Sequence, residues 1–148
     1  MSKAISRRDF MKVTGAVGAA GLLAACGGRS VPSDYDAEAC TDLSIRIERR
    51  DSLTQYDYAC IIAQNRAILE YLVERAGDID GMPDSVRYTA WRELLAEPEY
   101  LERFGYMFTL GSALYNADVD GLLDDDNSRA YAELDTFNHR LATLADRF

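Results

Sequence analysis

The chain has 148 residues, enough for one small domain with its own hydrophobic core, and 48% of them are apolar. It carries 25 acidic residues against 16 basic ones, which gives a formal net charge of −9. Because an acidic surface repels anionic phosphates, we expect no nucleic-acid partner.

The first 26 residues have the pattern of a secretory signal. A charged segment, residues 6–12, precedes an apolar run of thirteen residues, Val13–Ala25, and then Cys26. A transmembrane helix needs about 20 apolar residues, so the run is too short to be one. Residues 1–25 are therefore expected to be removed from the mature protein and to contribute nothing to its fold.

Two motifs in this region carry a family resemblance. Residues 6–12 hold Arg7, Arg8, Phe10 and Lys12 and resemble the twin-arginine export motif, except that methionine at position 11 replaces the commoner leucine. The resemblance implies that the twin-arginine translocase handles the chain during export. The motif is an address read by a receptor and is not itself an anchor.

The second motif, Leu23–Cys26, resembles the lipobox of bacterial lipoproteins. The resemblance implies cleavage before Cys26, a diacylglycerol on its sulfur, and acyl chains such as palmitate that hold the protein on a membrane. The expected location is the extracytoplasmic side, either periplasmic or at the cell surface. These motifs cover 26 of 148 residues and imply nothing about activity.

Removal of residues 1–25 changes the charge and the cysteine count. The signal holds four of the 16 bases and one of the 25 acids, so the mature chain keeps 12 bases, all Arg, against 24 acids, a net charge of −12. With Cys26 lipidated, Cys40 and Cys60 remain outside the cytoplasm, where disulfides persist. Two interpretations are open: a disulfide, or two separate buried thiols.

The mature chain divides into a tether and a single domain. Residues 26–36 are polar, contain Gly, Pro and Ser, and predict a flexible tether. Residues 37–148 predict one α-helical domain. Within residues 37–50, apolar positions alternate as in a strand but also fit helical spacing. Helix is favoured because no second good strand exists to pair with it.

A longer helix is predicted for residues 55–75, begun by Ser52 or Thr54 as a cap and ended at residues 76–78, where Gly77 stands. Asn65 interrupts its apolar stripe, either as a satisfied core amide or at the edge of the stripe. The next helix begins with Asp84 or Ser85 as its cap, and its expected apolar face is Val86, Ala90, Trp91, Leu94 and Leu95.

Pro98 is suited to the first turn of the following helix, residues 99–116. That helix is apolar over most of its circumference, so we expect it to be the central and most buried one. Gly105 and Gly111 are unfavourable in a helix, and either allow a neighbouring helix to approach closely or make room for a ligand.

The last helix is predicted from about Asp126 or Asn127 to the end of the chain. Its apolar residues, Leu134, Phe137, Leu141, Leu144 and Phe148, repeat at alternating spacings of three and four. The predicted fold is therefore all-α, a small helical bundle of four to five helices after a signal peptide and short tether.

No pattern in the chain predicts catalysis, a metal or a cofactor. The acidic stretch 117–127 does not match an EF-hand, because Arg129 occupies the position of the bidentate carboxylate. His139, the single histidine, is expected at the surface rather than as a metal ligand. No nucleophile elbow or phosphate-binding glycine loop is present.

Five aromatic residues, Trp91, Tyr100, Phe104, Tyr106 and Phe108, cluster in the sequence and are the candidates for a ligand or partner surface. At helical spacing they also suit a core, and Tyr100 and Tyr106 are expected to be the most exposed. The leading hypothesis is a non-enzymatic, membrane-anchored lipoprotein that acts through contacts with an unknown protein partner. The alternative is a cofactor- or small-ligand-binding helical module that is exported folded.

Overall fold

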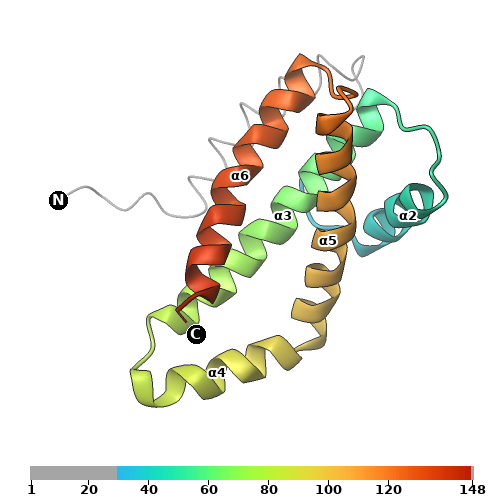
Figure 1. The fold of residues 1–148 in the computed structure, drawn as a ribbon. Helices are drawn as coiled ribbons and strands as arrows, with labels where there is room; N and C mark the ends of the chain where they lie inside the picture. The colour runs from blue at the N-terminus through green and yellow to red at the C-terminus, as the bar shows by residue number, and fades with distance from the viewer. Residues whose placement is uncertain (1–29, 148) are drawn as a thin grey trace.

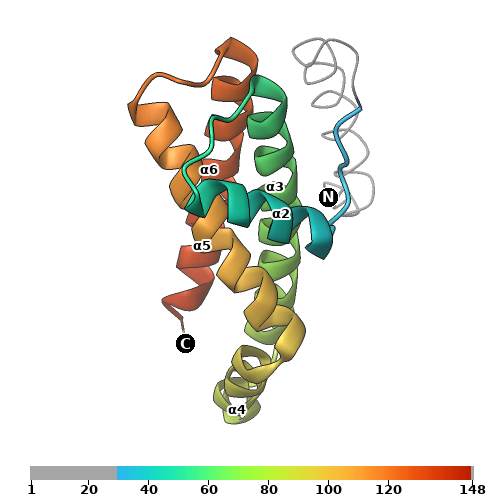
Figure 2. The same cartoon turned by 90° about the vertical axis from the view of Figure 1, so that its right-hand side faces the viewer.

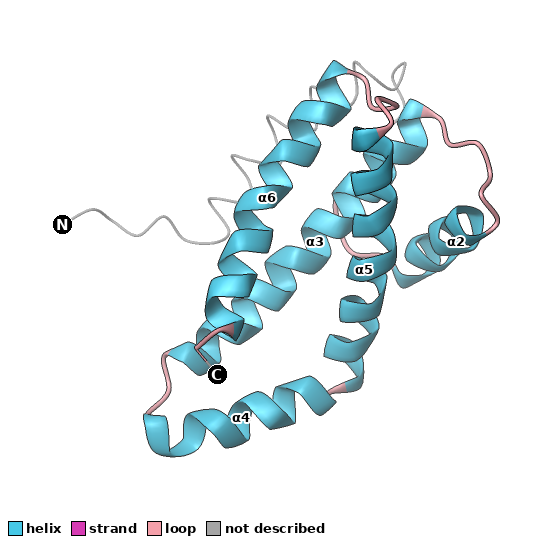
Figure 3. Cartoon of the chain, viewed as in Figure 1, coloured by secondary structure: helices cyan, strands magenta, loops and turns pink. Residues whose placement is uncertain are grey.

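The computed structural model describes residues 30–147, so the predicted export residues and Cys26 lie outside the described part. Within it, five helices form an all-α bundle and no strand is present, which confirms the predicted fold class (Figures 1 and 3). The helices are α2 (Ala37–Glu48), α3 (Gln55–Asp80), α4 (Asp84–Ala96), α5 (Pro98–Val119) and α6 (Asp125–Ala145). None of the helices in residues 30–147 is both long and apolar enough to span a membrane.

Helix α3 forms the centre of the bundle. It lies between α5 and α6, and each of these two helices packs along it (Figure 1). Helix α4 crosses the end of the bundle where α3 ends, and α2 lies across α3 and α5 (Figure 2). Helices α5 and α6 have no extensive contact with each other.

The central position of α3 corrects the prediction that residues 99–116 would form the most buried helix. Thirteen residues of α3 are buried, including Ile61, Ile68 and Leu72, whereas α5 buries four of its 22 residues. The physical reason is that α3 has neighbours on most of its circumference, while one side of α5 stays open to solvent. Apolar composition alone does not determine which helix is surrounded.

Local signals explain where several helices begin. Thr54 accepts a hydrogen bond from the backbone of Asp57 and Asp57 returns one, so the predicted capping box is present. Pro98 occupies the first turn of α5 as predicted. Asp124 caps α6 by accepting from the backbone nitrogen of Asn127. Residues 37–48 are helical, as favoured over a strand, with Asp36 as the cap.

Two helix predictions were wrong. Helix α3 continues through Gly77 to Asp80 and ends at Gly81. Its backbone hydrogen bonds continue past Gly77, since the N–H of Gly81 still donates to the carbonyl of Gly77. Helix α4 has no side-chain cap, and only Leu94 of its predicted apolar face is buried. Val86 and Leu95 are 48% and 39% exposed, since α4 crosses the end of the bundle and is covered on one side only.

Candidate functional site

A groove lies where α5 and α6 diverge over α3. Its floor includes Asn65 from α3, and one wall is formed by α5, the other by α6. The groove has a volume of about 450 Å³, within the range of about 300–1,000 Å³ that is usual for small-molecule sites. Its lining residues are Asn65, Met107, Phe108, Gly111, Ser112, Tyr115, Asn116, Tyr131 and Asn138.

Asn65 is the buried polar residue of this groove. Its side chain is 2% exposed, and its Oδ1 has no hydrogen-bond partner among the described residues. A buried polar atom without a partner costs about 1–3 kcal/mol. The amide is therefore not the satisfied core amide that the sequence allowed.

Gly111 faces the Asn65 amide from α5. A Cβ added at Gly111 would lie 3.8 Å from Nδ2 of Asn65, an ordinary van der Waals distance. The backbone of Gly111 is not in the left-handed region, so neither backbone conformation nor crowding requires glycine here. Glycine costs a helix about 1 kcal/mol relative to alanine. What its missing side chain does provide is space above the Asn65 amide.

Aromatic side chains form the rims of the groove. Phe108 and Tyr115 on α5 are 59% and 62% exposed, large values for residues of this size. Tyr131 contributes from α6, and it is half-buried against the core. Burial raises the pKa of Tyr131, with Asp118 and Asp135 adding to the effect, so its hydroxyl is a neutral donor and acceptor at physiological pH.

The predicted aromatic surface is not a single surface. Tyr100, Phe104 and Phe108 form a ladder along α5, with ring centroids 6.2 and 4.9 Å apart. The ladder runs from the core to solvent, because Tyr100 is 1% exposed whereas Phe108 is exposed. Only Phe108 of the five predicted residues lines the groove. Trp91 lies on α4, half-buried against the core.

The prediction that Tyr100 is among the most exposed aromatics was wrong. Its ring lies 6.5 Å from that of Tyr71, at the junction of α3 with the start of α5, and burial raises its pKa to about 12. Tyr106 is half-buried, and its hydroxyl shares a hydrogen bond with Thr41 of α2. Both residues therefore contribute to packing between helices.

Cys40 and Cys60 are not joined by a disulfide, so the structure corrects the disulfide interpretation in favour of separate thiols. Cys40 is fully buried, and its thiol donates to Oε1 of Gln64 at 3.4 Å. Burial, followed by the nearby carboxylates of Asp36 and Glu102, raises the pKa of the Cys40 thiol to about 11. Such a thiol is a poor nucleophile at neutral pH.

Gln64 also holds the end of the predicted tether against the domain. Its Oε1 accepts from the backbone nitrogen of Asp36, and its Nε2 donates to the carbonyl of Asp34, both at 2.9 Å. Farther back, the hydroxyl of Tyr56 donates to the carbonyl of Ser30 at 3.2 Å. The described end of the tether, residues 30–36, is thus docked on α3.

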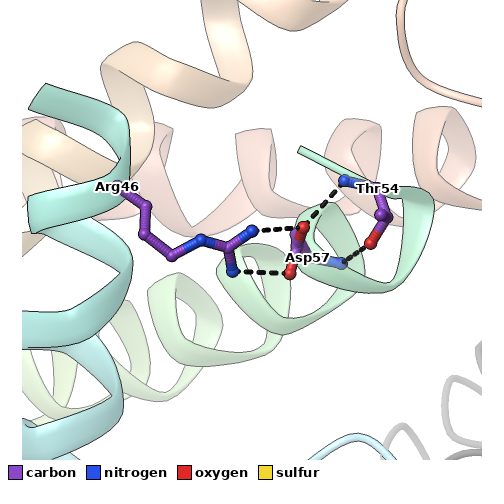
Figure 4. A network of polar contacts seen from close by, with 3 residues as sticks. All are labelled: Arg46, Thr54 and Asp57. Atoms are coloured by element: carbon purple, nitrogen blue, oxygen red, sulfur yellow. Dashed lines mark hydrogen bonds and ion pairs between the residues drawn. The ribbon is translucent and has the colours of Figure 1, made fainter. Parts of the chain in front are cut away.

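The ion pair between Arg46 and Asp57 holds two helices together. Both guanidinium nitrogens of Arg46 donate to the carboxylate of Asp57 at 2.8 Å, and the backbone nitrogen of Thr54 donates to the same carboxylate (Figure 4). These bonds tie α2 to the start of α3. They lower the pKa of Asp57 to about 2, with the Arg46 bond as the largest cause.

Within residues 30–147, no three His, Cys, Asp or Glu side chains are grouped so that they could hold a metal ion. His139 is exposed on α6, where the sequence placed it. Six groove residues were not indicated by any sequence pattern, and they form no motif: Met107, Ser112, Tyr115, Asn116, Tyr131 and Asn138. Asn65 and Gly111 were the two signals that could have located the groove.

Comparison with known proteins identifies the beginning of the chain. Residues 4–24 match the family described as the twin-arginine translocation pathway signal sequence. This signal directs the chain to the twin-arginine translocase and across the cytoplasmic membrane. Neither a curated protein nor a solved structure matches the chain.

Proposed function

We propose that the exported chain is a lipoprotein, anchored through Cys26, whose helical domain acts by binding a small neutral ligand in the groove. The observation that carries the binding role is the groove lined by the buried Asn65 amide, whose Oδ1 lacks a partner and whose Nδ2 faces the space left by Gly111. The lipobox Leu23–Cys26, directly after the export signal, supports the anchor.

The docked tether would hold the domain close to the membrane. Ser30 is four residue steps from Cys26, and a chain extends at most about 3.6 Å per step, so the two residues are at most about 14 Å apart. Ser30 lies against Tyr56, in the first turn of α3. The lipid would therefore place this end of the bundle next to the bilayer.

The membrane-facing end would be acidic. Gln55, at the start of α3, donates to the carbonyl of Leu122 and accepts from the backbone nitrogen of Asp124, so the acidic α5–α6 loop lies at the same end. Acidic side chains repel anionic head groups. The lipid would hold the domain near the membrane, and the acidic charge would limit its direct contact with anionic head groups.

A Cys26→Ala variant tests the anchor. It should move the protein from the membrane fraction to the soluble fraction. The N-terminal peptide should lack the added mass of the diacylglycerol. Cys60→Ala is the matched control, because it removes a cysteine from the domain and should leave the protein on the membrane. Membrane association of Cys26→Ala equal to that of wild type would contradict the anchor.

A screen of neutral fragments against the mature protein by ligand-observed NMR tests the binding role. We expect hits that Gly111→Ala weakens, because its methyl group fills the space above Asn65. Gly105→Ala is the matched control, since it lies on the same helix with nothing within 4 Å. Hits that both variants bind like wild type would show that the groove is not the site.

A second candidate function, contact with a partner protein, is favoured by the exposed side of α5. Leu101, Phe108 and Tyr115 lie seven residues apart and are 53%, 59% and 62% exposed, which gives a stripe suited to a partner helix. A photo-crosslinker at Leu101 should capture a defined partner in cells, whereas one at Thr136, exposed on α6, should not. Equal capture at both positions would remove this candidate.

A further inference from the structure

We propose that the ligand of the groove is a neutral saccharide, a mono- or disaccharide unit. This inference rests on the proposed function, because it names the chemical class that the groove between α5 and α6 would bind. Three properties of the lining carry it: the absence of charge, the kind of polar groups, and the aromatic faces beside them.

The lining of the groove is uncharged in a strongly charged domain. None of the nine lining residues is acidic or basic, although the mature chain has 24 acids against 12 bases. A charged ligand group would lose hydration in the groove without gaining an opposite charge. The net negative charge of the domain also repels anionic ligands. A neutral ligand is the one that this lining accommodates.

The polar groups of the lining both donate and accept hydrogen bonds. The lining has three carboxamides, on Asn65, Asn116 and Asn138, and it also has the hydroxyls of Ser112 and Tyr131. A carboxamide carries a donor and an acceptor side by side, and a hydroxyl does both with one atom. Adjacent sugar hydroxyls match this arrangement, since each can donate to one group and accept from the next.

A wholly apolar ligand does not meet the same requirement. It would cover the amides of the lining and offer them no hydrogen-bond partner. A sugar hydroxyl can accept from Nδ2 of Asn65, which faces the space left by Gly111, and can donate to the other amides. The polar groups of the lining therefore favour saccharides over acyl chains and other hydrocarbons as occupants.

Aromatic faces complete the match. Phe108, Tyr115 and Tyr131 line the groove, and Phe108 and Tyr115 present rings that are more than half exposed. A pyranose ring is amphipathic in the same way as the groove, with C–H groups on its faces and hydroxyls around its edge. Stacking a sugar face on an exposed ring would bring its hydroxyls to the amides. The groove volume of about 450 Å³ is adequate for a small ligand of this kind.

Calorimetric titration of the mature protein, kept in a detergent without a sugar head group, tests the proposal. The probes are glucose, cellobiose, N-acetylglucosamine and N,N′-diacetylchitobiose, with glucuronate and a capped trialanine as comparisons. We expect saturable binding of at least one neutral sugar and weaker binding of glucuronate. Gly111→Ala should lower the affinity for the sugar by about tenfold or more, while Gly105→Ala should change that affinity by less than about twofold.

The two glycine variants separate binding from folding. Both replace glycine in the interior of α5 by alanine, so both should raise the thermal midpoint. Loss of binding in Gly111→Ala alone therefore cannot result from unfolding. Gly111-dependent binding of trialanine, with no binding of any sugar, would overturn the saccharide and leave the groove as a ligand site. No Gly111-dependent binding of any probe or fragment would overturn both proposals.

Discussion

The bond between Arg46 and Asp57 predicts how the domain responds to acid. Asp57 has a pKa lowered from the usual 3.8 to about 2, and its side chain is 12% exposed. Each pKa unit corresponds to about 1.4 kcal/mol, so the ionised carboxylate stabilises the fold by about 2 kcal/mol. Because the folded pKa is the lower one, this stability is present above pH 4 and is lost as the pH falls toward 2.

An Asp57→Asn variant removes the ionised group without removing the side chain. At pH 7 we expect its free energy of unfolding to be about 2 kcal/mol below that of wild type. The Asn side chain is neutral and has one acceptor oxygen, whereas the carboxylate accepts both guanidinium bonds. The difference should shrink between pH 4 and 2, as Asp57 of the wild type becomes protonated. The assay is urea unfolding of the mature protein at a series of pH values.

The matched control is Asp84→Asn. Asp84 also pairs with an arginine, Arg87, but its side chain is 91% exposed, so this pair should contribute little to stability. The variant should unfold like wild type at every pH. A difference between Asp57→Asn and wild type that stays constant from pH 7 to pH 2 would refute the stabilising role of the ionised Asp57.

Two further predictions concern the docked tether and the thiols. Gln64→Leu should lower the free energy of unfolding by about 2 kcal/mol, since two backbone hydrogen bonds are lost, and should speed hydrogen exchange at the Asp36 amide. Unchanged exchange would show that other contacts hold the tether. Thiol titration of the denatured, non-reduced mature protein should find two thiols, Cys40 and Cys60. None would indicate a disulfide, and three would indicate that Cys26 carries no lipid.

The sequence by itself determined the export route and the positions of most helices, because these depend on residues close together in the chain. The twin-arginine signal is a local motif, and it was confirmed by the family match to residues 4–24. Thr54 with Asp57 begins α3, and Pro98 begins α5, through bonds and backbone angles within one turn. The extension of α3 past Gly77 was missed because it depends on tertiary packing, since Ile79 beyond the glycine is buried in the core.

Only the tertiary structure decided which helix is central and where the groove lies. In sequence, α5 is apolar over most of its circumference and α3 along one stripe, but neighbouring helices cover α3 on most sides and leave part of α5 open. Asn65 and Gly111 were visible in the sequence as departures from helical patterns. Their meaning depended on α6, whose Tyr131 and Asn138 close the groove from a distant part of the chain. Two helices that pack on a third, but not on each other, leave a space that no local pattern encodes.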